Sequence, residues 1–244
     1  MTICTVPVAL SNMKIFPLND AIMLDFIDEI QATCITTFTG KPIAFSSDAT
    51  HYIVVQKGEF VITLDNNNYT LRTESFGAFP GPARLQGKGN ALIVSAAKYR
   101  GPLLLGGPIE KQGRLRYIDG CSSSLLLPPA VKGEPCLNFL HLPPQISQTM
   151  HTHPTLRTGL ILSGNGKCET LEGRQEFSAG TAFVIPPGVA HSFQSQQEEM
   201  RIVIYHPDSD SGPTHENHTM LNRTFIDGVS AQSITALHTQ MEAQ

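Results

Sequence analysis

The residues best suited to chemistry in this chain are three histidines in its second half. His151 and His153 are separated by one residue, and His191 follows five positions after Pro186. Residues i and i+2 of a β-strand point to the same face, so His151 and His153 can present two imidazole rings to one point. Neutral imidazole is a common ligand of divalent transition metals. Three rings that converged inside a sheet would form a metal site.

The composition favours many short strands joined by turns. The chain has 244 residues, of which 41% are hydrophobic and only 16% charged, with 20 Gly and 17 Pro. A helical bundle would be richer in charged and helix-forming residues. The net charge is −4 and no cluster of Lys and Arg occurs, so the footprint of a nucleic-acid-binding protein is missing.

Cysteine usage and hydropathy point to a soluble protein of the cytoplasm. The five cysteines are irregularly spaced and include no C-x-x-C pair, which argues against a disulfide framework and against a cysteine zinc site. The first residues lack the pattern of a signal peptide. No apolar run approaches the roughly 20 residues of a membrane span. We therefore expect a cytoplasmic protein without a membrane segment.

Strand-like runs recur every eight to twelve residues, which is typical of a β-sandwich or barrel. We expect strands within 31–39, 52–56, 60–64, 69–72, 91–96, 136–142, 150–153, 159–162, 167–171, 175–177, 181–185 and 201–205. The segment Lys57–Glu59 is expected to be a turn between two of them. One or two helical turns are expected over Asn19–Ile30, so the predicted fold class is all-β with few short helices.

Two landmarks repeat at one separation and indicate an internal duplication. Gly58 and Gly164 lie 106 residues apart, and Pro80 and Pro186 do as well. The chain is accordingly divided into an N-terminal barrel, a breaker-rich linker, a C-terminal barrel and a polar tail. Their predicted bounds are 1–100, 101–133, 134–207 and 208–244.

The same offset indicates that the first barrel has lost its histidines. The counterparts of His151, His153 and His191 on this offset are Phe45, Ser47 and Leu85, and His51 corresponds to Arg157. A single histidine cannot hold a transition metal, so the first barrel is expected to be structural.

The motifs of the second half resemble those of the cupin superfamily. The second cupin motif, G-x5-P-x-G-x2-H-x3-N, is matched at Gly180, Pro186, Gly188 and His191, and Ser195 replaces the final Asn. The first motif, G-x5-H-x-H-x(3,4)-E-x6-G, is matched at His151, His153 and Gly164, with Gln145 at the first Gly and Arg157 at the Glu. The resemblance implies two tandem double-stranded β-helix barrels of the jelly-roll type, which is a bicupin.

The resemblance also implies one divalent metal, bound by His151, His153 and His191. Many cupins add a Glu ligand, and the similar proteins without it include three-His non-haem iron dioxygenases that act on thiols, diketones or gentisate-type acids. Iron is therefore the first expectation, with Zn, Ni, Mn and Cu as alternatives.

Arg157 allows two interpretations. If it points inward, as the Glu it replaces would, its guanidinium can hold a substrate carboxylate beside the metal, as part of the catalytic site. If it points outward, it pairs with a surface acid.

Several further residues are candidates for minor roles. Gln145, Gln148 and His141 could approach the site or bond to the backbone, and Cys168 fits a buried thiol better than a redox centre. His215 and His218 are expected to be solvated.

The leading hypothesis is a non-haem iron oxygenase acting on a small anionic or chelating substrate. Two alternatives stay open: a non-catalytic small-molecule-binding or sensing cupin, and a Zn or Ni isomerase that uses the metal as a Lewis acid. The expected partner is a small molecule rather than nucleic acid or membrane, and a homodimer is left open. No G-x-S-x-G elbow supports serine hydrolysis.

Overall fold

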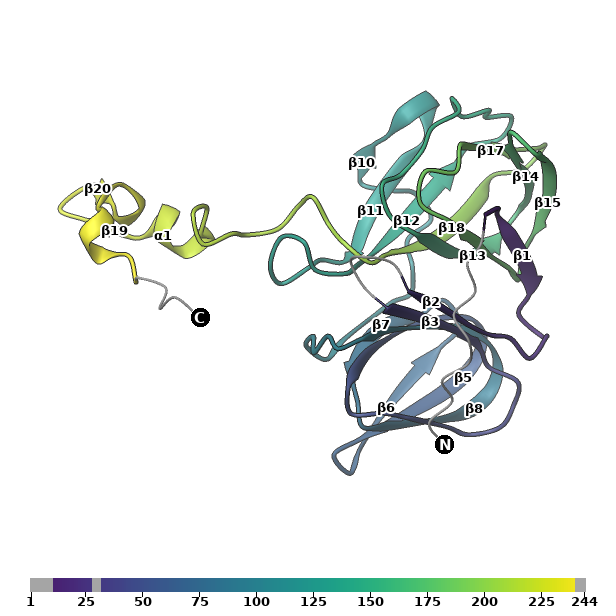
Figure 1. Cartoon of the computed structure of the whole chain (residues 1–244), viewed down its shortest axis with the longest axis horizontal. Helices are drawn as coiled ribbons and strands as arrows, with labels where there is room; N and C mark the ends of the chain where they lie inside the picture. Colours follow the sequence, from purple (N-terminus) through teal and green to yellow (C-terminus); the bar gives the residue numbers. More distant parts are fainter. Residues whose placement is uncertain (1–10, 28–31, 240–244) are drawn as a thin grey trace.

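The computed structural model describes residues 11–27 and 32–239 and contains two β-rich halves and a C-terminal arm (Figure 1). The described residues contain one short α-helix, α1 (Thr219–Arg223), so the predicted all-β class is confirmed. Within these residues, no helix has the length and apolarity that crossing a bilayer requires.

The first half is an eight-stranded sheet. Its main path runs β2-β3-β8-β5-β7-β9, with β4 paired to β8 and β6 paired to β5. The strands are β2 (Met23–Ile27), β3 (Ala32–Thr37), β4 (Ile43–Phe45), β5 (Ala49–Leu64), β6 (Asn67–Arg72), β7 (Phe76–Pro80), β8 (Ala83–Ala97) and β9 (Leu104–Gly106).

The second half contains two sheets. A seven-stranded sheet has the order β1-β16-β13-β18-β12-β11-β10, and a three-stranded sheet has the order β15-β14-β17. The strands are β1 (Lys14–Pro17), β10 (Leu115–Arg116), β11 (Ser122–Leu127), β12 (Cys136–Leu142), β13 (Arg157–Ser163), β14 (Asn165–Thr170), β15 (Gly173–Ser178), β16 (Thr181–Ile185), β17 (His191–Ser195) and β18 (Met200–His206).

Two segments connect the halves more closely than a simple linker would. Strand β1, at the start of the described chain, pairs with β16 of the second half, with Lys14 opposite Val184. The expected linker 101–133 contributes β9 to the first sheet and β10 and β11 to the seven-stranded sheet. A 3-10 turn, η1 (Ile118–Gly120), lies between β10 and β11. The division into four segments remains a proposal.

Apolar side chains form three layers: one between the two halves, one inside the first half and one inside the second half. Successive residues of a strand point to opposite faces, so β13 sends Leu160 and Leu162 toward the first half and Ile161 into the second. In β5, Val54 joins the layer between the halves while Ile53 lies inside the first half. The strands β16, β13, β18 and β12 of the seven-stranded sheet are thus covered on both faces.

Two local expectations are wrong. Part of the segment expected to be helical, Asn19–Ile30, is the strand β2, paired antiparallel with β3; residues 28–30 lie outside the described residues. Pairing with β3 overrides a weak helical tendency. The expected turn at Lys57–Glu59 is instead a bend inside β5, where the register with β8 shifts between Val55 and Lys57. Such a bulge bends a strand without reversing it.

The C-terminal arm contains only short elements. After α1 come β19 (Phe225–Ile226), β20 (Val229–Ser230) and two 3-10 turns, η2 (Ala231–Ser233) and η3 (Thr235–Leu237). Figure 1 shows this arm extending away from both halves.

A buried ion pair joins the two halves. Arg201 on β18 donates to both carboxylate oxygens of Glu74, at 2.7 and 3.0 Å, and also to the backbone oxygens of Ile109 and Glu110, each at 3.0 Å. The Arg201 side chain is 8% exposed and that of Glu74 is 30% exposed. The buried cation therefore depends on this one carboxylate.

We expect Glu74→Gln to lower the free energy of unfolding by about 2 kcal/mol, because a buried, hydrogen-bonded cation loses its counter-charge. Urea unfolding measures this. The matched control is Glu59→Gln, whose pair with Arg72 is exposed and should be worth less than about 1 kcal/mol. Equal effects of the two substitutions would contradict the importance of the Arg201 pair.

Candidate metal centre

Three histidines converge in the second half. His151, His153 and His191 each offer one ring nitrogen, and these nitrogens lie within 4.8 Å of one another, as in groups that could hold a metal ion. The ring centroids of His151 and His191 are 4.6 Å apart, and that of His153 is 5.1 and 5.2 Å from them. His151 and His191 also exchange backbone hydrogen bonds of 3.0 and 2.9 Å, which fixes the spacing of these two residues.

In His151 and His191, the ring hydrogen bonds use Nδ1 and leave Nε2 free to bind a metal. Nδ1 of His151 bonds to the Thr149 carbonyl at 2.8 Å, and Nδ1 of His191 bonds to the Val189 carbonyl at 2.9 Å. A carbonyl only accepts, so Nδ1 carries the hydrogen and Nε2 keeps its lone pair for a ligand.

Burial keeps two of the rings neutral. It lowers the pKa of His153 to about 3, with further lowering from Arg157 and the other two rings. Burial also lowers the pKa of His191 to about 4. The neutral form is the one that binds metals, so protons do not compete for these nitrogens near pH 7.

The His-x-His pair lies mostly outside regular strands. His151 forms an isolated bridge to His191, residues 152–156 are irregular, and β13 begins at Arg157. The expected strand over 150–153 is therefore wrong, because Pro154 cannot donate to a ladder. The rings converge all the same.

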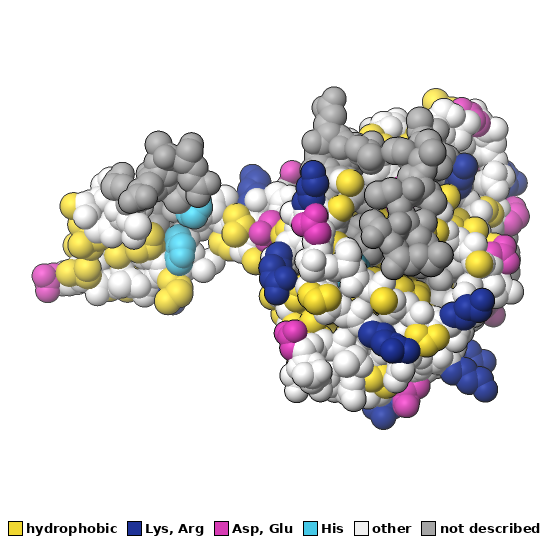
Figure 2. All heavy atoms as spheres, turned by 60° about the horizontal axis from the view of Figure 1, so that its bottom comes forward, with side chains coloured by type: hydrophobic (Ala, Val, Ile, Leu, Met, Phe, Trp, Pro, Cys, Tyr) yellow, Lys and Arg dark blue, Asp and Glu magenta, His cyan; other side chains and the backbone are white. Residues whose placement is uncertain are grey.

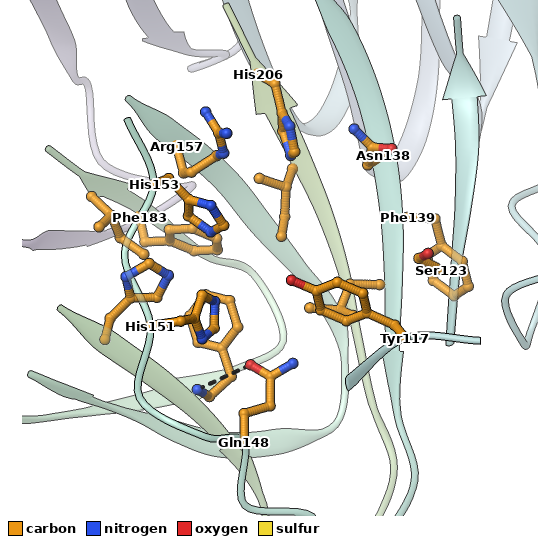
Figure 3. A pocket seen from close by; sticks show the side chains of 15 residues that line it. Tyr117, Ser123, Asn138, Phe139, Gln148, His151, His153, Arg157, Phe183 and His206 are labelled. Carbon is orange, nitrogen blue, oxygen red and sulfur yellow. Dashed lines mark hydrogen bonds between the residues drawn. The ribbon is translucent and has the colours of Figure 1, made fainter. Parts of the chain in front are cut away.

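The cluster lies in one wall of a cavity of about 120 Å³ (Figure 3). Its apolar lining includes Phe183, Ile185, Phe193 and Ile204. Besides the three histidines, the polar lining contains Tyr117, Ser123, Asn138, Gln148, Arg157 and His206.

Arg157 lies between the cavity and an acid. The residue is 8% exposed and lines the cavity, and its Nη1 is 3.7 Å from Asp208. The same nitrogen donates to the Leu156 carbonyl at 2.9 Å and to the Thr155 hydroxyl. Among the described residues, buried Nε of Arg157 has no hydrogen-bond partner. Arg157 thus lines the cavity and lies close to Asp208 at the same time, and its role in binding a substrate stays a prediction.

Four polar residues of the cavity are not foreseen from the sequence: Tyr117, Ser123, Asn138 and His206. His206 ends β18, its ring centroid is 6.5 Å from that of His153, and burial lowers its pKa well below the ordinary value. Asn138 lies on β12, and Tyr117 comes from the segment expected to be a linker. Alternation could have suggested His206 and Asn138, because each lies two positions from an inward residue, Ile204 and Leu140. No sequence signal marks Tyr117.

Of the candidates Gln148, Gln145 and His141, only Gln148 lines the cavity. Gln148 lines the cavity, but its amide bonds to Cys121 Sγ at 3.4 Å and to the Phe193 N–H at 3.3 Å. Gln145 is exposed and has a φ of 61°, the conformation that explains a Gly at this motif position. His141 is outside the cavity lining, and its Nε2 is 3.0 Å from Glu199.

The other candidates have structural roles. Cys168 is fully buried in the apolar core, and burial raises the pKa of its thiol to about 12, which suits an inert thiol. His215 and His218 are exposed, and His218 caps α1 by accepting from the Met220 and Leu221 N–H groups.

The strand registers of the two halves agree with the 106-residue offset. Residues of β5 pair with β7 as their counterparts in β13 pair with β16. In each case, adding 106 to both residues of a β5–β7 pair gives a β13–β16 pair. His51–Phe79 corresponds in this way to Arg157–Ile185, Tyr52–Ala78 to Thr158–Val184, Ile53–Gly77 to Gly159–Phe183, and Val54–Phe76 to Leu160–Ala182.

The counterpart of His191 differs from the expected Leu85. Phe45 pairs with Ala83 as His151 pairs with His191, so Ala83 occupies the position of His191. The segment from Pro80 to Ala83 is two residues shorter than that from Pro186 to His191, which shifts the offset.

Aromatic side chains fill the first half where the cavity lies in the second. The His51 ring is 4.3 Å from that of Phe45 and 5.4 Å from that of Phe79, and its Nδ1 is 2.7 Å from the Ser95 hydroxyl. Burial lowers the pKa of His51 to about 4. These contacts support a structural role for the first half.

Comparison with known proteins identifies the class. Residues 138–206 match the cupin domain family model, and this region of the chain is a cupin domain. The match contains His151, His153 and His191, and the all-β jelly-roll fold agrees with it. No curated protein matches the chain in sequence.

Solved structures show the same fold over most of the chain. A cupin 2 conserved barrel domain protein from Leptotrichia buccalis has a TM-score of 0.60 at 13% identity, covering 83% of this chain and 100% of that protein. A putative glyoxylate-induced protein from Pseudomonas aeruginosa has a TM-score of 0.60 at 12% identity, with coverages of 88% and 95%. Salicylate 1,2-dioxygenase from Pseudaminobacter salicylatoxidans has a TM-score of 0.55 at 10% identity, with coverages of 76% and 76%.

We expect His51→Phe to flatten the pH dependence of stability in acid. The pKa of His51 falls from 6.5 to about 4 on folding, so the unfolded chain binds the extra proton between these values. Stability contributed by neutral His51 is complete above pH 6.5 and is lost as the pH falls toward 4. Urea unfolding across that window measures the slope for both proteins. An unchanged slope would contradict the buried, neutral state of His51.

Proposed function

We propose that this chain is a metal-binding cupin whose second half holds one divalent metal through His151, His153 and His191. The observation that carries the proposal is the convergence of three ring nitrogens in a partly apolar cavity, with the Nδ1 atoms of two rings already bonded to carbonyls. An all-imidazole set suits Fe, Zn, Ni, Cu or Mn.

Iron and oxygenase chemistry are our first choice because the residue at the fourth-ligand position is Arg157, which cannot coordinate a metal. A three-histidine site leaves positions for a chelating substrate and for O2, and the bound metal would supply the means of activating them. The fold likeness to a salicylate 1,2-dioxygenase agrees with this class of reaction, although at 10% identity it supports the fold alone.

The cavity favours a small, anionic substrate. Its volume of about 120 Å³ is slightly below that of cavities of about 150 Å³ that bind benzene. Arg157 lines the cavity and its Nε has no partner among the described residues, so a carboxylate that reached this guanidinium would gain a charge-assisted hydrogen bond beside the three histidines. Asn138, Tyr117 and His206 supply further polar contacts, while Phe183 and Phe193 exclude water.

Loss of a ligand should abolish metal binding. We expect His151→Ala and His191→Ala each to lower the metal content of the purified protein at least about tenfold, because two imidazoles hold an ion poorly. Elemental analysis measures this. His215→Ala, which removes an exposed histidine of the arm, is the matched control and should keep its metal. Metal content equal to that of the unmodified protein in both ligand variants would refute the site.

Arg157 should govern the use of acids but not the retention of metal. With iron-loaded protein, O2 uptake is measured on a panel of small hydroxy acids, thiols and diketones. We expect Arg157→Gln to raise KM for carboxylates about 10–100-fold, the value of one or two charge-assisted hydrogen bonds, and to leave neutral diketones unaffected. The KM of Arg157→Lys for carboxylates should lie between those of the unmodified protein and Arg157→Gln, because lysine keeps the positive charge but lacks the planar guanidinium edge.

The panel also tests the reaction class. If metal-loaded protein consumes no O2 with any member, the oxygenase proposal fails, and a binding role or Lewis-acid chemistry takes its place. If Arg157→Gln uses acids as well as the unmodified protein does, the proposed role of Arg157 in binding carboxylates is refuted, and the oxygenase proposal is unaffected.

A further inference from the structure

The C-terminal arm, residues 214–239, has a defined conformation held by its own hydrogen bonds. His218 caps α1, the Asn222 side chain donates to that of Asn217 at 2.9 Å, and the Gln232 amide donates to the Glu216 carbonyl at 2.6 Å. Helix α1 packs on η2 and β20, and β19 pairs with β20. The arm is therefore a specified structure.

The arm lacks a core that could stabilise this structure. Of its 26 residues, only Ala231 is buried. Its large apolar side chains are instead exposed: Met220 by 72%, Phe225 by 61%, Ile226 by 41%, Val229 by 49% and Leu237 by 50%. Figure 2 shows apolar side chains along the surface of the arm. Segments below about 40 residues and isolated two-stranded hairpins are rarely stable alone. A second surface must cover these side chains.

The root of the arm directs it away from its own body. The Gly133 N–H donates to the Ser209 carbonyl at 2.8 Å, and the Lys132 N–H donates to the Pro213 carbonyl at 2.9 Å. Gly212 adopts a φ of +122°, and a Cβ there would lie 2.9 Å from the Lys132 nitrogen. The chain is thus held at its point of exit, and Figure 1 shows the arm projecting beyond it.

A groove lies beside the root of the arm, because two of its residues, Leu115 and Leu125, also line a cavity with residues 208–211. It has a volume of about 450 Å³ and is lined by apolar Phe76, Ile109, Leu115, Leu125 and Leu126, with Glu110, Arg114 and Ser124 as polar members. Leu115 and Leu125 are 62% and 38% exposed. Strands β7, β10 and β11 carry most of these residues, and Figure 1 places the three strands on the arm's side. Within residues 11–27 and 32–239, β10 is also the terminal strand of its sheet, and no strand of these residues pairs with its outer edge.

We propose that the arm of each chain docks in this groove of a second copy, forming a closed dimer by exchange of arms. Because groove and arm root lie on one side, a two-fold axis that faces two such sides brings each arm over the other groove, and no surface is left to extend the assembly. A standard interface uses about 20–30 residues per partner, which the exposed residues of the 26-residue arm and the residues of the groove together can supply. Phe225 and Val229 are the apolar anchors, with Leu125 on the receiving side.

Light scattering during size-exclusion chromatography of the full chain tests this proposal. The unmodified protein should have twice the chain mass of 26.5 kDa. The double variant Phe225→Ser/Val229→Ser and the single variant Leu125→Glu should each weaken the dimer about 30-fold or more and elute as monomers at low concentration. Leu171→Glu, a change at an 84% exposed leucine of the β14–β15 turn, is the control and should remain dimeric.

Each other outcome overturns the proposal. A monomeric unmodified chain removes the second copy as the occupant, and a dimer that survives both sets of changes does not use the arm. A dimer broken only by the arm variant excludes this groove as the receiving surface. Circular dichroism verifies that each variant is folded, and this readout does not depend on the proposed metal centre.

Discussion

The seven-stranded sheet must be covered on both faces, and this constraint explains the organisation of the chain. One face of β13, β16 and β18 packs inside the second half, and the other packs on the first half. If the face toward the first half were exposed to water, hydrophobic free energy would be lost at every alternate residue of these strands. The first half supplies the missing cover, with Tyr52 against Tyr205 at a centroid distance of 5.0 Å. Its role is therefore explained without any ligand of its own.

The same constraint limits where polar residues can lie. The middle of most strands is committed to packing, so most polar groups of the cavity occur at strand ends or in loops: Arg157 begins β13, His191 begins β17 and His206 ends β18, while Asn138 lies within β12. Their neighbours in the strands, such as Leu160 and Val203, hold the backbone in place. An apolar sheet thus positions a set of polar side chains at its margins, an arrangement in which chemistry and packing can change independently.

The parts of the structure that could be predicted from sequence are those set by short-range spacing. His151, His153 and the Gly180–His191 motif identify the cluster, and the 106-residue offset between Gly58 and Gly164 agrees with the register of β5 and β13. Long-range pairing could not be predicted in the same way. The strand β2 depends on β3 for its conformation, and Tyr117 reaches the cavity because Asp119 binds the Thr149 N–H at 2.6 Å. Neither partnership has a local sequence signature.

The pairing of β1 with β16 has a consequence for the order in which the protein can fold. Lys14 lies opposite Val184, so β1 can pair only after β16, which lies much later in the chain, has been synthesised. Contacts of such large sequence separation form late and slowly, since loop closure must precede them. Until the second half is complete, β1 has no edge to join and the apolar face of the first half has no cover. On the ribosome, the first half is therefore an unfinished intermediate, and the two halves mature together as one cooperative unit.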